Sequence, residues 1–109
     1  MAQNFDLYGS KRLTISELRN VIENALGLIF DVHESSYRGG EYFRSVPCDG
    51  EEFVIQLNSF WLDNEMEIAE PDYSDYAVIF WVAWTGRADE LREQLAEIND
   101  LDFLRRRDR

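Results

Sequence analysis

Residues 76–85 read YAVIFWVAWT, and this stretch limits the possible folds more than any other part of the sequence. Successive side chains of a β-strand point to opposite faces of its sheet. Here both alternating sets are apolar: Val78 and Phe80 belong to one set, and Ile79 and Trp81 belong to the other. A strand without a polar face is covered on both sides or lies in the middle of a sheet. We therefore expect a layered fold built around this strand.

Two amphipathic helices are predicted, one before and one after the strand-forming region. In the first, Thr14 and Glu17 have the spacing of a capping box, apolar residues then recur at helical spacing, and Gly27 is a typical stop. The second covers residues 87–98, RADELREQLAEI, where two acidic residues in the first turn accompany a narrow apolar stripe. Each helix therefore has one face that packs on a core.

Between the helices the apolar period changes to two, which is typical of strands. Gly39, Gly40 and Gly50 provide turns, because glycine readily takes a positive φ. The predicted strands are residues 28–35, 41–46, 51–58 and 76–84. The resulting order is α-β-β-β-β-α, which indicates an α+β fold: a two-layer sandwich of a mainly antiparallel four-stranded sheet and two helices.

The chain of 109 residues has the size of one ordinary domain. Residues 1–104 are predicted to form a single α+β domain, and residues 105–109, RRRDR, a solvated basic C-terminal tail. The formal net charge is −11, from 22 acidic and 11 basic residues. Such a surface repels nucleic acid and anionic membranes and attracts basic proteins. We therefore expect a basic protein partner, and no direct contact with nucleic acid or a membrane.

The single cysteine and the first residues of the sequence indicate in which cellular compartment the protein is expected. The start, MAQNFDLYGSKR, has no apolar core of a secretory signal peptide. The single cysteine, Cys48, cannot form an internal disulfide, and nothing indicates an oxidising compartment. Cys48 is predicted in a turn beside Asp49, whose carboxylate disfavours a reactive thiolate. The sequence is thus typical of a cytoplasmic protein without a cofactor.

The most unusual segment lies between the third and fourth predicted strands. Residues 58–76, NSFWLDNEMEIAEPDYSDY, contain six carboxylates and four aromatic rings but no lysine, arginine or histidine. One interpretation is a solvated acidic loop whose apolar residues pack into the core. The other is a docking surface, in which the acids face a basic partner and the rings anchor it. The candidate partner-binding residues are Trp61, Asp63, Glu65, Glu67, Glu70, Asp72, Tyr73 and Asp75.

Neither a metal site nor a catalytic site is predicted. Asp63, Glu65 and Glu67 alternate like the first ligands of a calcium loop, but Ile68 stands where that loop requires glycine. The lone histidine, His33, is expected on the polar side of its strand, and no nucleophile elbow or other catalytic frame accompanies it. The chain is therefore not expected to be an enzyme. A small hydrolase or metal-dependent enzyme that uses His33 with acids of the loop stays an open alternative.

Several parts of the sequence together resemble the small acidic immunity proteins that bacteria make against toxins. These are the acidic aromatic loop 61–76, the hairpin RGGEYFR (38–44) that runs into GEEFVIQLN (50–58), and the closing strand and helix from 77 to 98. The resemblance is one of size, charge and pattern. It implies a binding module that neutralises a cognate basic toxin, for example a nuclease, by placing the acidic loop in the toxin's basic groove.

The alternative from a different class is a homo-oligomeric structural or regulatory domain without catalytic activity. If both helices cover the same face of the sheet, Ile79 and Trp81 on the opposite face need a cover. A second chain can supply it, so that a homodimer forms around these two residues. Apolar residues of the N-terminal segment are another candidate cover: Phe5, Leu7 and Tyr8.

Overall fold

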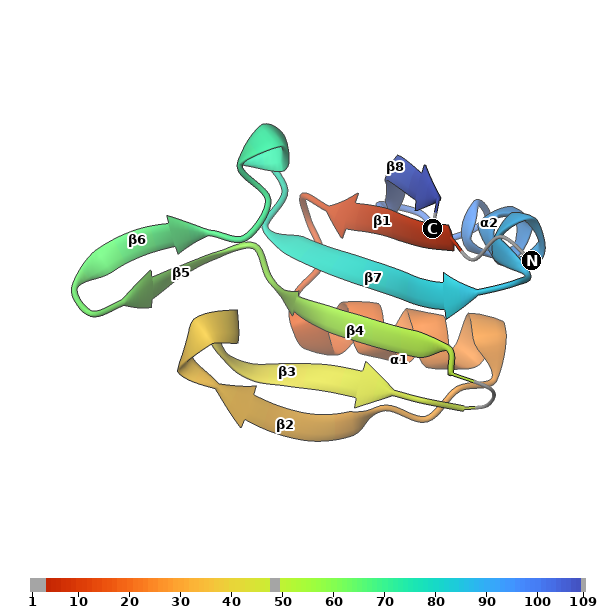
Figure 1. The fold of residues 1–109 in the computed structure, drawn as a ribbon, viewed down its shortest axis with the longest axis horizontal. Helices are drawn as coiled ribbons and strands as arrows, with labels where there is room; N and C mark the ends of the chain where they lie inside the picture. Colours follow the sequence, from red (N-terminus) through yellow and green to blue (C-terminus); the bar gives the residue numbers. More distant parts are fainter. Residues whose placement is uncertain (1–3, 48–49, 109) are drawn as a thin grey trace.

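The structure is a computed structural model that describes residues 4–47 and 50–108. Cys48 and the neighbouring Asp49 of the predicted turn lie outside the described residues. The elements follow one another as β1 (Asn4–Ser10), α1 (Ile15–Leu26), β2 (Asp31–Ser35), η1 (Ser36–Arg38), β3 (Gly40–Ser45), β4 (Glu52–Leu57), β5 (Ser59–Leu62), β6 (Glu65–Ile68), η2 (Pro71–Tyr73), β7 (Val78–Thr85), α2 (Ala88–Leu95) and β8 (Asp102–Asp108). Figure 1 shows this arrangement, in which η1 and η2 are short 3-10 helices.

Six strands form one antiparallel sheet in the order β2-β3-β4-β7-β1-β8, and β5 pairs with β6 in a separate hairpin. The α+β class, with two helices and a mainly antiparallel sheet, is thus confirmed. The four-stranded sheet and the order α-β-β-β-β-α are wrong. β1 precedes the first helix, β8 follows the second, and both belong to the sheet.

The two unexpected sheet strands come from segments with strongly polar residues. β1 carries Asp6, and β8 carries residues 105–107, the arginines that the sequence analysis assigns to a solvated tail. β1 pairs with β7 on one side and with β8 on the other. These partners lie far away in the sequence, so local periodicity gives no sign of them. The N-terminal apolar residues expected as a cover are instead part of the sheet: Phe5, Leu7 and Tyr8.

Both helices contribute to one apolar core on the same face of the sheet. Leu18 and Ile22 of α1 and Leu91 and Leu95 of α2 are at most 1% exposed. Full burial of such a side chain is worth about 1.5–3 kcal/mol relative to exposure. The two helices therefore pack on the sheet from one side.

The ends of α1 are those that the sequence predicts. The Thr14 hydroxyl accepts a hydrogen bond from the Glu17 backbone N–H at 3.1 Å, and the Glu17 carboxylate accepts one from the Thr14 N–H at 2.9 Å. Gly27 ends the helix in the left-handed conformation, with φ 68°. Both signals are local, which is why they can be recognised from the sequence.

β7 occupies the central position predicted for it, between β4 and β1. Phe80 lies in the core below the helices, and Ile79 points to the opposite face, yet both are 0% exposed. The segment between β6 and β7 closes one end of that opposite face: Tyr73 donates a hydrogen bond to the Leu104 carbonyl at 3.2 Å, and Glu70 pairs with Arg105 at 3.1 Å. No helix of residues 4–47 and 50–108 covers the remainder of this face, and we call it the open face.

Candidate functional site

The acidic segment is built around a β-hairpin rather than a loop. β5 and β6 extend beyond the end of the six-stranded sheet (Figure 1). The two residues between them, Asp63 and Asn64, have φ of 49° and 68°. Positive φ at both central positions is typical of a type I′ hairpin turn, and Asp and Asn tolerate it better than other non-glycine residues. The Asp-Asn pair between alternating residues is a signal for this hairpin that the sequence analysis missed.

The register of the hairpin places three exposed apolar residues on one face and its two strand glutamates on the other. Trp61 lies opposite Met66, while Phe60 lies opposite Glu67. Since cross-strand partners share a face, Trp61, Met66 and Ile68 form one face, with exposed fractions of 69%, 50% and 37%. We call these three residues the apolar hairpin face. The other face carries the carboxylates of Glu65 and Glu67, which are both exposed.

The base of the hairpin is anchored on the β2–β3 turn. Phe60 is only 8% exposed and packs on Gly39. A Cβ atom at Gly39 would lie 3.1 Å from the Phe60 side chain, and the φ of Gly39 is +85°. Glycine is therefore required here both by the backbone conformation and by the close approach of the ring.

Asn58 holds together the two ends of the segment that connects β4 with β7. Its side chain is fully buried and donates hydrogen bonds to the carbonyls of Tyr73 and Tyr76, at 2.9 and 3.0 Å. Its side-chain oxygen accepts a hydrogen bond from the Glu70 N–H at 2.9 Å. The two ends of the hairpin segment are thereby held together. Sequence reasoning did not identify Asn58, because its partners are 12 to 18 residues away.

The predicted partner-binding residues fall into two groups. Trp61, Asp63, Glu65 and Glu67 lie on the hairpin and are exposed. Among the described side chains, no ion pair involves these three acids. The hairpin thus brings one aromatic ring and three solvated carboxylates onto a single projecting ribbon.

The second group lies between β6 and β7 and contacts the protein's own body. Glu70 pairs with Arg105, and both side chains are less than 20% exposed. Tyr73 stacks on Tyr76, with ring centroids 6.5 Å apart. Asp75 is exposed and lies 3.7 Å from Lys11, while Asp72 is exposed on η2. Glu70 and Tyr73 therefore act in this structure as packing residues of the segment.

Tyr76, next to this group, makes a further hydrogen bond within the chain. Its hydroxyl donates a hydrogen bond to Asp102 at 2.8 Å. Burial, and then this hydrogen bond, raise the pKa of the Tyr76 phenol to about 12. The phenol consequently remains a neutral donor throughout the physiological pH range, and it fixes the segment before β7 to the start of β8.

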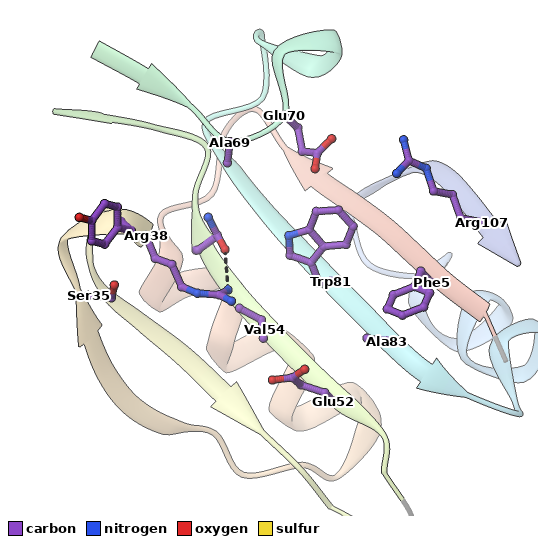
Figure 2. Close-up of a pocket in the computed structure, with 12 residues that line it drawn as sticks. Phe5, Ser35, Arg38, Glu52, Val54, Ala69, Glu70, Trp81, Ala83 and Arg107 are labelled. Carbon is purple, nitrogen blue, oxygen red and sulfur yellow. Dashed lines mark hydrogen bonds between the residues drawn. The ribbon is translucent and has the colours of Figure 1, made fainter. Parts of the chain in front are cut away.

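The open face of the sheet carries a groove of about 560 Å³ (Figure 2). Its floor includes Val54 and Trp81, and Phe5 lies toward one end. Arg38 and Arg107 stand at opposite ends of the groove (Figure 2). We call this the open-face groove. Trp81, a residue of the predicted oligomer face, lines it and is half-buried, whereas Ile79 of the same predicted face is fully buried.

The residues considered for metal binding or catalysis come from separate elements, with Glu65 and Glu67 on β6 and His33 on β2. In residues 4–47 and 50–108, no three His, Cys, Asp or Glu side chains form a group suited to a metal ion. His33 lies on β2 and stacks on Tyr42, with ring centroids 5.4 Å apart.

Neither the helices nor similarity to known proteins assigns the chain to a class. Neither helix in the described part of the chain is long and apolar enough to span a membrane. No protein-family model, no curated protein and no solved structure matches the chain.

Proposed function

We propose that the chain is a binding module that captures a basic protein with its β5–β6 hairpin, and that it neutralises a toxin in this way. The observation that carries the proposal is the exposure of Trp61, 69%, on an ordered ribbon whose three nearby carboxylates are solvated. Exposed aromatic anchors and complementary charge are typical of protein-binding surfaces.

The two-faced hairpin suits insertion into a concave basic site. The apolar hairpin face can pack on one wall of a groove, while Asp63, Glu65 and Glu67 meet cationic groups on another. A toxin that cleaves a polyanionic substrate needs a basic groove, and an acidic inhibitor gains fast association by electrostatic steering toward it. The resemblance to acidic immunity proteins points to the same kind of partner.

The anchoring of the hairpin favours tight binding. Asn58 and Phe60 fix its base within the chain, so little conformational freedom is lost when a partner binds. A ribbon that is ordered before association avoids part of the entropic cost of binding. The proposal therefore includes the hairpin's rigid base as well as its exposed tip.

The test uses a toxin domain encoded next to the gene for this chain in its native host. We expect the variant D63K/E65K/E67K to slow association about 10- to 100-fold and to weaken its salt dependence, because steering is lost. We expect Trp61→Ala to speed dissociation about 30-fold, which is the effect of losing an aromatic anchor. Stopped-flow mixing at several salt concentrations measures both rates.

A matched control carries the same change in net charge elsewhere. Glu90, Glu93 and Glu97 are exposed on or next to α2, away from the hairpin. The variant E90K/E93K/E97K should slow association far less than the hairpin variant. Equal slowing by the two variants, with Trp61→Ala neutral, would contradict docking by the hairpin, and a toxin domain that fails to bind would contradict neutralisation.

The homo-oligomeric alternative has less support from the open face. Ile79 is fully buried, and the Arg105 guanidinium lies 5.7 Å from the Trp81 ring centroid. A dimer that forms there would have to displace Arg105 from this ring. Light scattering at high concentration tests the alternative directly, since a dimer that dissociates in Trp81→Arg would favour it.

A further inference from the structure

The open-face groove has an apolar floor. The small apolar side chains of Val54 and Ala83 form part of this floor, and Trp81 lies between the two ends of the groove (Figure 2). A volume of about 560 Å³ falls within the range of small-molecule sites in proteins. The indole of Trp81 is half-buried and, beside the Arg105 guanidinium that lies 5.7 Å from its ring centroid, presents a flat surface on which a planar ligand can stack.

The charges that line the groove leave an excess of positive groups. Its two acids each have an arginine partner that is not part of the lining: Glu52 is bonded by Arg44, and Glu70 pairs with Arg105. Its two arginines have no carboxylate partner among the described side chains. The unpaired arginines of the groove therefore favour an anion there, although the net charge of the chain is −11.

Two contacts hold the Arg38 side chain in place. Its guanidinium donates a hydrogen bond to the neutral Gln56 side chain at 2.9 Å and lies 5.0 Å from the centroid of the Tyr42 ring. A guanidinium has five N–H donors, so this arrangement leaves donors for a ligand. Arg107, at the other end of the groove, is exposed on β8 and less constrained. The preorganised Arg38 is therefore the stronger anion-binding group.

A bulge in β7 positions the aromatic end of the groove. The register between β1 and β7 shifts between Asn4 and Asp6, so that Phe5 lies at the irregularity. Trp84, in β7, has a φ of 59°, a conformation that non-glycine residues rarely adopt. Its ring packs edge-on against Phe5, with centroids 4.4 Å apart. Strained backbone of this kind tends to occur at functional sites.

We infer that the open-face groove binds a small organic anion with a flat apolar body, stacked on Trp81 and held at its charged group by Arg38, with Arg107 as a second contact. The charged group is a carboxylate or a phosphate, since a guanidinium pairs with either. This site is separate from the β5–β6 hairpin, and the inference does not depend on the proposed capture of a basic protein.

Three probes test the inference: 2-naphthoate, 2-naphthyl phosphate and the neutral 2-naphthalenemethanol. We expect at least one of the two anions to bind with a dissociation constant of about 1 mM or below. The alcohol should bind about tenfold more weakly, because it cannot pair with a guanidinium. Heteronuclear NMR titration measures the affinities, and the Trp81 indole N–H resonance must shift on binding. The stronger of the two anions identifies the charged group.

Variants then assign the anion contact. Arg38→Gln should weaken the anions about tenfold and leave the alcohol unchanged, and Arg107→Gln should weaken them about threefold. Arg12→Gln, which removes an exposed arginine outside the groove, is the matched control and should change nothing. If Arg38→Gln loses the fold, as judged by circular dichroism, Arg107→Gln on the edge strand carries the test.

Several outcomes would overturn the inference. They are equal affinity for the alcohol and the anions, absence of binding by both anions, anion binding that is indifferent to Arg38→Gln and Arg107→Gln, and binding that leaves the Trp81 resonance unmoved. The hairpin variant D63K/E65K/E67K should bind the probes as tightly as the parent chain does. The experiments therefore distinguish failure of the groove inference from failure of the proposed hairpin function.

Discussion

At the scale of single residues, Asn58 organises more of the candidate site than any exposed side chain. One buried amide satisfies the backbone of three positions between β6 and β7: Glu70, Tyr73 and Tyr76. Each of these groups would otherwise need water or another partner, and an unsatisfied buried group costs about 1–3 kcal/mol. The rigidity of the hairpin base therefore depends on this residue.

Asn58→Ala should lower the free energy of unfolding by about 2–4 kcal/mol, because it removes three hydrogen bonds at a site without access to water. Urea denaturation measures this loss. Asn24→Ala, which changes an exposed asparagine of α1, should remain within about 0.5 kcal/mol of the parent chain. A loss below about 1 kcal/mol for Asn58→Ala would mean that the segment holds its shape without the amide.

The contrast between Asn58 and the cap of α1 shows which residue roles can be predicted. Thr14 and Glu17 bond within one turn, so their spacing in the sequence already contains the geometry. Asn58 follows an ordinary strand, and its partners become neighbours only after a hairpin has formed between them. Likewise the pairing of Glu70 with Arg105 depends on tertiary structure, so the sequence alone leaves Glu70 looking as available as Glu65.

At the scale of elements, periodicity locates the parts of the fold that bury a continuous apolar stripe. Both helices and β3, β4 and β7 follow from it, and so does β2, which covers Asp31–Ser35 of the predicted residues 28–35. β1 and β8 do not, because the side chains they turn toward the helices include charged ones, Asp6 and Arg106. These charges form a pair in the folded chain, with Nε and Oδ1 2.8 Å apart, but each by itself indicates solvated surface. The hairpin was missed because its strands have only four residues each.

The Asp63–Asn64 turn gives a prediction for the hairpin as an element. Asn64→Val places a β-branched residue at a φ of 68°, which should destabilise the turn by about 1–2 kcal/mol. Amide hydrogen exchange in β5 and β6 should then accelerate about tenfold, while the six-stranded sheet keeps its protection. Asn64→Gly is the matched control, since glycine accepts this φ without strain, and exchange should be unchanged or slower. Faster exchange in β4 and β7 as well would show that the hairpin is not an independent unit.

At the scale of the whole molecule, one ion-pair network joins the two ends of the described chain. Arg106 of β8 donates to both oxygens of Asp6 of β1, at 2.8 and 3.0 Å, and to Asp89 of α2 at 2.7 Å. The hydrogen bonds to Asp6 and then to Asp89 raise the pKa of Arg106 above its usual value. Asp6 is 1% exposed, so its charge is acceptable only with this partner.

Arg106→Ala should therefore cost about 3–5 kcal/mol of folding free energy, because it leaves a buried carboxylate without its counter-ion. Arg107→Ala, one position along the same strand but exposed, should cost less than about 1 kcal/mol. Urea denaturation of both variants makes the comparison. Similar small losses for the two variants would mean that Asp6 can be neutralised or hydrated without Arg106.

The position of β1 between β7 and β8 also dictates how the protein can be made. During translation, β1 leaves the ribosomal exit tunnel while both of its strand partners are still unsynthesised. β1 stays unpaired until β7 and β8 have emerged, and pairing of such distant segments is slow. The nascent chain consequently carries β1 without strand partners until residues 78–108 have been synthesised, so the sheet can be completed only late in folding.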